Sequence, residues 1–234
     1  MLKSSSRGVS TDVDCLEHPL EEALPYEARL RRSFPLALRE AGAHDAGSSA
    51  VDETLYRLAA RLDQSGIPYA LIGALALGVH GYVRMTTDID LVMTADGLRR
   101  FRETCVGLGY RPAFPGAERT FRDVESQVRI EVVESGAYPG DGRPKPIAFP
   151  DPSAAALVGQ VRVVPLETLI ELKLASGLTA PDRLKDLADV QELIRVAALP
   201  RDLAKRLDAS VRGEYERLWR TVDEASDPYD EARM

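Results

Sequence analysis

The chain has 234 residues, of which 44% are hydrophobic, and its formal net charge is −7 with a sequence pI near 5.2. This length suits one core with a helical extension, and the acidic balance argues against wholesale electrostatic binding of nucleic acid. No run approaches the roughly 18 consecutive apolar residues of a membrane span, and the polar stretch 1–10 lacks the apolar centre of a signal peptide. We therefore expect a cytoplasmic protein without a membrane partner.

Cysteine and histidine offer little for metal chemistry. The only cysteines are Cys15 and Cys105, which leaves one disulfide open but gives no disulfide framework and no Cys-based zinc site. The histidines at positions 18, 44 and 80 show no metal-ligand spacing. A protein of this charge that handled a nucleoside triphosphate would need a metal ion and a few placed cations to hold the phosphates.

The first 50 residues look peripheral, because Ser- and Gly-rich stretches flank a weak helical pattern at 26–41 that Pro35 interrupts. They predict a flexible or loosely docked N-terminal arm. From residue 51 the hydrophobic periodicity is stronger and predicts alternating helices and strands. The expected helices are 51–65, 74–80 and 95–108, and the expected strands are 69–72, 87–93, 127–133 and 161–164, with a Pro/Gly-rich loop at 138–152.

After Pro165 the pattern becomes helical, with expected helices at 166–176, 183–196, 202–211 and 214–225. This order of elements predicts an α+β or α/β sheet domain followed by a C-terminal helical bundle. The expected divisions are an arm over 1–50, a sheet core over 51–164 and a helical region over 165–226.

Asp88 and Asp90 give the strongest chemical signal. Residues i and i+2 of a strand face the same side, so both carboxylates point one way while Ile89 and Leu91 face the core. Paired carboxylates repel each other unless a cation lies between them, and hard oxygen ligands suit Mg²⁺, which also binds phosphate oxygens. For a bare Asp-x-Asp, a strand whose polar face meets solvent is the commoner explanation.

The residues around this pair suit phosphate binding. Gly73 lies between a strand and a short helix, where a phosphate can approach backbone N–H groups. Thr86 and Thr87 offer hydroxyls just before Asp88, and Arg84 adds a cation. Alone each signal is weak, because glycines end strands in many folds.

A third carboxylate is expected from a neighbouring strand. Glu131 lies on the face opposite Val128, Ile130 and Val132, and Glu134 is the second choice. A third oxygen donor would complete a two-metal site and accept the proton of an attacking hydroxyl. An exposed strand glutamate explains the spacing equally well.

Lys173 lies on the apolar stripe of the helix expected after Pro165. A lysine directed toward the core either extends its ammonium to water or has a partner, and a triphosphate in a cleft would be one such partner. Asp186 and Asp189 share a face of the next helix. They would pair with Lys173 or its basic neighbours, position the acceptor, or form ordinary surface salt bridges.

Together these motifs resemble a known family. The runs 72–76 and 87–91, with His80-Gly81 and Arg84 between them, resemble the nucleotidyltransferase domain of the AbiEii-type toxin family, which belongs to the DNA polymerase β-like nucleotidyltransferase superfamily. Lys173 and the run 185–189 are similar to that family's lysine helix and Arg-Asp-x-x-Asp motif. The resemblance covers roughly residues 51–196.

The resemblance implies an α+β fold with a nucleotidyltransferase-type mixed β-sheet flanked by helices. It implies metal-dependent transfer of NMP from an NTP to an unidentified acceptor, which would be a tRNA, a protein or a small molecule. Members act as toxins of toxin–antitoxin or abortive-infection systems, so an antitoxin protein is an expected partner. The expected residues are Asp88, Asp90 and Glu131 for Mg²⁺ or Mn²⁺; Gly73, Ala74, Arg84, Thr87 and Lys173 for the NTP; and Asp186 near the catalytic centre.

Three positions depart from the family's pattern. Ala74 stands where a second Gly or a Ser is usual, and Glu131 stands where Asp is usual. Lys185 stands where Arg is usual, which loses the bidentate guanidinium fork. The alternative function is therefore a catalytically impaired member of the same fold that binds a nucleotide or a partner.

Overall fold

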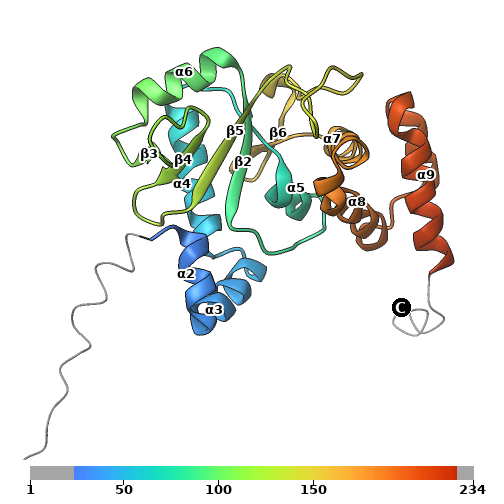
Figure 1. Ribbon diagram of the computed structural model, residues 1–234, viewed down its shortest axis with the longest axis horizontal. Coiled ribbons are helices and arrows are strands. Elements are labelled where there is room, and N and C mark those ends of the chain that lie inside the picture. Colours follow the sequence, from blue (N-terminus) through green and yellow to red (C-terminus); the bar gives the residue numbers. More distant parts are fainter. Residues whose placement is uncertain (1–23, 226–234) are drawn as a thin grey trace, which may run out of the picture.

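The computed structural model describes residues 24–225, in which a seven-stranded mixed sheet is flanked by helices (Figure 1). The sheet has the order β3-β4-β5-β2-β1-β7-β6, with β2–β5 and β1–β7 parallel and the other neighbours antiparallel. The α+β class expected from the sequence is confirmed. The strands are β1 Ala70–Leu71, β2 Asp88–Met93, β3 Tyr110–Pro112, β4 Thr120–Asp123, β5 Arg129–Glu134, β6 Ala156–Val158 and β7 Val161–Val163.

The helices cover the sheet and extend past it at the C-terminal side (Figure 1). Ser49 caps the helix α4 (Ala50–Gln64) through a capping box. Gly66, at φ +60°, follows the end of this helix, which agrees with the stop expected from the sequence. The helices are α2 Tyr26–Arg32, α3 Phe34–Asp45, α4 Ala50–Gln64, α5 Gly73–Val79, α6 Ala95–Thr104, α7 Leu166–Thr179, α8 Leu184–Val196 and α9 Ala209–Glu224, with short 3₁₀ turns η1 Pro152–Ala154, η2 Pro181–Arg183 and η3 Arg201–Arg206.

The parallel pair β2–β5 lies in the middle of the sheet and fixes the position of the acidic residues. Asp88 is paired with Arg129, and Asp90 is paired with Glu131. The intervening residues Ile89 and Ile130 are fully buried, so the opposite face of both strands belongs to the hydrophobic core. Strand alternation therefore directs the side chains of Asp88, Asp90 and Glu131 to one side.

The described part of the N-terminal region differs from the expected flexible or loosely docked arm. Tyr26 of α2 is 2% exposed, and its hydroxyl donates to Glu40 at 2.9 Å. Glu27 accepts two hydrogen bonds from the buried guanidinium of Arg122 on β4, at 2.6 and 3.0 Å. Pro35 lies in the first turn of α3, where a proline is tolerated, and Ser33 caps that helix. Residues 24–50 are thus tied to the sheet through α2.

Three helix predictions at other places are wrong in extent. The helix expected at 95–108 ends at Thr104, because the segment that follows turns through Gly107 and Gly109, both at positive φ. The helices expected at 202–211 and 214–225 are instead the turn η3 and a single helix, α9, which Asp208 caps. None of the helices between residues 24 and 225 combines the length and apolar character that crossing a membrane requires.

The docking of α2 is testable by truncating its buried aromatic residue. We expect Tyr26→Ala to lower the free energy of unfolding by about 3 kcal/mol, because it leaves a cavity under α2. The matched control is Phe34→Ala on α3, where the side chain is 75% exposed and the effect should stay within about 0.5 kcal/mol. Urea denaturation measures both variants. Equal, small effects would show that α2 does not unfold together with the sheet.

Candidate active site

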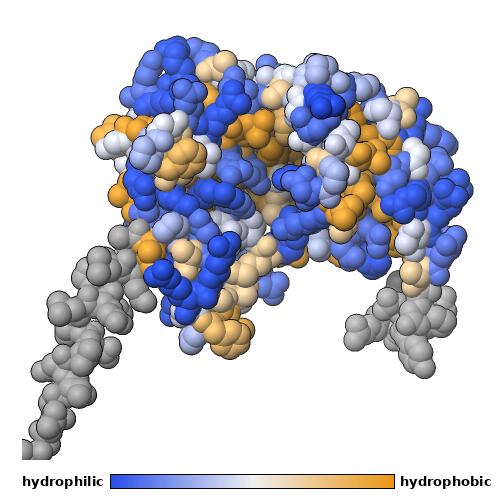
Figure 2. All heavy atoms as spheres, viewed as in Figure 1, coloured by the Kyte–Doolittle hydropathy of each residue, from blue (hydrophilic) through white to orange (hydrophobic). Residues whose placement is uncertain are grey.

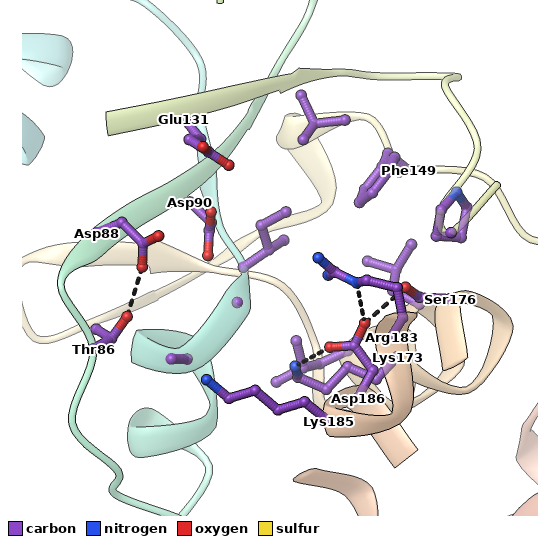
Figure 3. A pocket seen from close by; sticks show the side chains of 18 of the residues that line it. Thr86, Asp88, Asp90, Glu131, Phe149, Lys173, Ser176, Arg183, Lys185 and Asp186 are labelled. Carbon is purple, nitrogen blue, oxygen red and sulfur yellow. Dashed lines mark hydrogen bonds and ion pairs between the residues drawn. The ribbon is translucent and has the colours of Figure 1, made fainter. Parts of the chain in front are cut away.

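A cavity of about 390 Å³ lies between the exposed ends of β2 and β5 and the helices α7 and α8 (Figure 3). The face of the molecule drawn in Figure 2 is hollowed between the sheet and these C-terminal helices. We call the sheet side, which also carries Arg129, the acidic wall. We call the helix side, which carries Lys173, Arg183 and Lys185 together with Asp182 and Asp186, the basic wall. The acidic wall holds Asp88, Asp90 and Glu131, which we call the carboxylate cluster.

The structure brings the three carboxylates predicted from the sequence into one cavity. Asp88 and Asp90 come from β2, and Glu131 comes from the strand paired with it in register. Figure 3 shows Asp90 between the other two, with its carboxylate directed into the cavity. No hydrogen bond or ion pair to the Asp90 carboxylate occurs within residues 24–225, whereas Asp88 and Glu131 both have partners.

Gly73 is required because Asp90 lies against it. Gly73 has φ +69°, and a Cβ atom there would lie 2.1 Å from Oδ2 of Asp90. The backbone N–H of Ile72 also donates to the carbonyl oxygen of Asp90 at 3.0 Å, which holds the two segments together. The sequence pattern predicts that a phosphate approaches Gly73, whereas in the structure a carboxylate lies against it. Ala74, the next residue, also lines the cavity.

The charges of the cluster shift the acidity of its members in opposite directions. Burial, reinforced by the nearby charges of Asp88 and Glu131, raises the pKa of Asp90 from 3.8 to about 7. Burial also opposes ionisation of Asp88, but hydrogen bonds from Thr86 and Arg129 outweigh it and lower the pKa of Asp88. The cluster therefore places the pKa of its central carboxyl near neutral pH, so Asp90 exchanges a proton with solvent under neutral conditions.

Arg129 is a residue of the site that the sequence analysis missed. Its Nη2 lies 2.7 Å from Oδ2 of Asp88, and its Nη1 lies 3.1 Å from Oε1 of Glu131. The signal was present, because Arg129 and Glu131 are two apart on one strand and so face the same side. The spacing shows which side Arg129 faces, but its contact with Asp88 depends on the pairing of β2 with β5.

The expected metal site is not formed as a three-ligand cluster in this arrangement. Among residues 24–225 no three His, Cys, Asp or Glu side chains are arranged to hold a metal ion. Arg129 bonds to Asp88 and Glu131, two of the three predicted ligands. The donors themselves are carboxylate oxygens on one face of a rigid strand pair, which is the chemistry that Mg²⁺ and Mn²⁺ prefer. The donor set therefore fits such an ion in chemical type, while Arg129 contacts one oxygen of Asp88 and one of Glu131.

The basic wall is built on a buried network around Lys173. The side chain is 7% exposed, and its Nζ lies 2.7 Å from Oδ2 of Asp189 and 3.1 Å from Oδ1 of Asp186. Arg84 bonds to both carboxylate oxygens of Asp189, at 2.7 and 2.9 Å. The lysine on the apolar stripe therefore has a partner, as expected, but that partner is a pair of carboxylates from the next helix.

Asp186 is fully engaged within the same network. Its carboxylate accepts hydrogen bonds from Ser176 at 2.7 Å and from Arg183 at 2.9 Å, besides the contact with Lys173. Burial opposes its ionisation, but the nearby charges and these hydrogen bonds prevail and lower its pKa. Asp186 thus lies 6% exposed at the edge of the cavity as an ionised partner that fixes α7 against α8.

Lys185 is the basic residue whose charge is left free. It is exposed, it lines the cavity, and it makes no hydrogen bond or ion pair with any described residue. Figure 3 shows its ammonium extended toward Asp88, whose pKa it helps to lower. The threonine that lines the cavity is Thr86, whose hydroxyl donates to Asp88 at 2.6 Å, whereas Thr87 is not among the lining residues.

Comparison of the sequence with models of known protein families finds no match, and comparison with curated proteins finds none either. Similar solved structures include ANT(2'')-Ia in complex with adenylyl-2''-tobramycin, with 17% identity and a TM-score of 0.41, covering 72% of this chain and 94% of that chain. JHP933 from Helicobacter pylori has 16% identity and a TM-score of 0.39, covering 78% of this chain and 96% of that chain. A solution structure of ANT(2'')-Ia has 14% identity and a TM-score of 0.39, covering 76% of this chain and 95% of that chain. Likeness this distant is no basis for assigning a reaction to this chain.

The close approach of Gly73 and Asp90 predicts a large effect of a single added methyl group. Gly73→Ala should lower the free energy of unfolding by about 2 kcal/mol or more, from the left-handed backbone and the clash with the carboxylate. Gly78→Ala in the same helix is the control, because its nearest neighbour would be 3.9 Å away and alanine favours the helix. Urea titrations compare the two. An equally small change in both would contradict the packing described here.

The raised pKa of Asp90 predicts a characteristic pH dependence of stability. Between about pH 4 and pH 7 the folded chain keeps this proton while the unfolded chain has lost it, so stability falls as the pH rises. The loss should be on the order of 2–4 kcal/mol for the wild type and absent from Asp90→Asn, whose amide does not titrate. Urea unfolding in EDTA over this window measures the difference. Parallel profiles of the two proteins would contradict it.

Proposed function

We propose that this chain is a metal-dependent nucleotidyltransferase that moves a nucleoside monophosphate from an NTP to a hydroxyl of an acceptor. The observation that carries the proposal is that carboxylates and basic side chains face each other across one cavity. The carboxylate cluster on β2 and β5 faces the free ammonium of Lys185 and the half-exposed guanidinium of Arg183. A nucleoside triphosphate requires both, since its phosphates need cations and its bound metal needs carboxylate oxygens.

In this proposal the nucleotide tail is bound mainly by α8. Lys185 offers an unpaired charge at the cavity, which is the property that a phosphate-binding lysine needs. The buried Lys173 does not contact the nucleotide in this proposal, because Asp186 and Asp189 already bind its ammonium. It holds α8 in place and thereby positions Lys185. Gly73 and Ala74 contribute backbone at the start of α5, beside the carboxylates.

Mg²⁺ or Mn²⁺, held by Asp88 and Asp90 with Glu131 as the third donor, would supply charge neutralisation for the triphosphate. In the transfer step the acceptor oxygen bonds to the α-phosphorus, the bond from that phosphorus to the bridging oxygen breaks, and pyrophosphate leaves. Glu131 is the candidate to accept the hydroxyl proton, because its side chain is 39% exposed at the open side of the cluster. Positioning and charge stabilisation supply most of the rate increase.

The proposal extends to the acceptor and the biological role. A tRNA, a protein or a small molecule would supply the hydroxyl, and the chain would act as a toxin that an antitoxin protein neutralises. Its net charge of −7 disfavours a long RNA contact, so a protein or small-molecule acceptor is the preferred version. Incubation with each labelled NTP and a cell extract, followed by separation of RNA, protein and small molecules, identifies the acceptor.

A second candidate function is a catalytically impaired member that binds a nucleotide without turning it over. The observation that favours it is Arg129, which engages two of the three carboxylates. Ala74, Glu131 and Lys185 also depart from the residues that the resemblance would lead one to expect. This candidate predicts NTP binding in calorimetry but no pyrophosphate release with any acceptor.

The central test is removal of one carboxylate charge. Asp88→Asn should lower the rate of labelled-NMP transfer and pyrophosphate release by at least about 100-fold, since even supporting groups of metal sites matter that much. The control is Asp141→Asn, which removes a carboxylate that bonds to Lys145 outside the cavity and should leave the rate unchanged. Circular dichroism checks that both variants are folded. Full activity of Asp88→Asn would refute the assignment.

A further inference from the structure

We infer that Arg129 is the resident counter-cation of the carboxylate cluster and competes there with a divalent metal ion. The inference rests on the proposed function, because it concerns the same carboxylates. It adds a residue that controls how tightly and in what order the cluster takes up its ligands.

The contacts of Arg129 are those that a metal ion would need. Its two terminal nitrogens bond to Oδ2 of Asp88 at 2.7 Å and to Oε1 of Glu131 at 3.1 Å. Strand register makes this geometry inevitable, since Arg129 is the residue paired with Asp88 and stands two before Glu131. A metal ion that used these same two oxygens would compete with the guanidinium for them.

A bound cation lowers the repulsion within the cluster. Three carboxylates from two adjacent strands face one cavity, and their mutual repulsion is stronger there than in bulk water. Arg129 is the cation that does so in the structure, because Lys173 is committed to Asp186 and Asp189. A divalent metal ion in place of Arg129 would also offset the charge of the carboxylates, with two positive charges instead of one.

Arg129 is also the cation that is able to move. Its side chain is 37% exposed, whereas that of Lys173 is 7% exposed within a buried network. Withdrawal of Arg129 therefore exchanges half-exposed ion pairs, which are individually weak, for solvent.

The consequence is a metal affinity that is low until Arg129 is displaced. A free divalent ion must compete with the guanidinium for Asp88 and Glu131. A metal ion that arrives with a nucleotide brings additional contacts, through phosphates near Lys185, that offset the displacement. The site would thus bind the metal–nucleotide complex in preference to metal alone.

The test is Mn²⁺ binding to the full chain without nucleotide, measured by titration calorimetry and by the free-ion signal in electron paramagnetic resonance. We expect Arg129→Met to bind Mn²⁺ at least about fivefold more tightly than the wild type, because two half-exposed ion pairs no longer compete. Arg129→Gln is the second variant and should change in the same direction. The matched control is Arg119→Met, which breaks an ion pair with Glu134 of the same strand and should leave the affinity unchanged.

Thermal unfolding provides a second readout. Without metal, Arg129→Met should melt at a lower temperature than the wild type, and saturating Mn²⁺ should close this gap. If the wild type and both Arg129 variants bind Mn²⁺ equally, the inference on Arg129 is overturned while the metal-dependent function stands. If none of the chains binds Mn²⁺, both the inference and the metal part of the proposed function are overturned.

Discussion

The repulsion among three carboxylates on one face of a parallel strand pair is the constraint on which the site depends. β2 and β5 run in register through the middle of the sheet, so Asp88, Asp90 and Glu131 have no means of turning away from one another. The apolar faces of both strands are buried in the core, and a shift by one residue would expose that core. The fold therefore holds the acidic groups together and leaves the compensation of their charge to a cation.

Two ionic arrangements of different character lie at the cavity. Lys173, Asp186, Asp189 and Arg84 form a buried network that ties α7, α8 and the segment before β2 together. Breaking such a network would leave an uncompensated buried charge, which makes it a fixed part of the structure. Arg129 forms half-exposed pairs with Asp88 and Glu131 at the cavity. The cavity thus has a buried ionic network on its helix side and half-exposed ion pairs on its sheet side.

Much of the fold and part of the site were predictable because they follow from local pattern. Period-2 alternation located β2 and β5, and the burial of Ile89 and Ile130 agrees with it. The shorter α6 and the single helix α9 were not predictable, because caps and turns at their ends compete with periodicity that continues past them. The docking of α2 depends on the pair between Glu27 and Arg122, which are 95 residues apart in sequence.

By itself the sequence determined which residue types share a face of each strand and helix, because side-chain direction repeats with a fixed local period. That sufficed to choose Asp88, Asp90, Glu131 and Lys173 as residues that point into or toward one site. Only the tertiary structure decided what each of them touches. Gly73 makes room for Asp90, Lys173 is held by two aspartates, and Arg129 occupies the carboxylates. Such partners come from different elements, and the distances between elements are fixed by packing that no local pattern encodes.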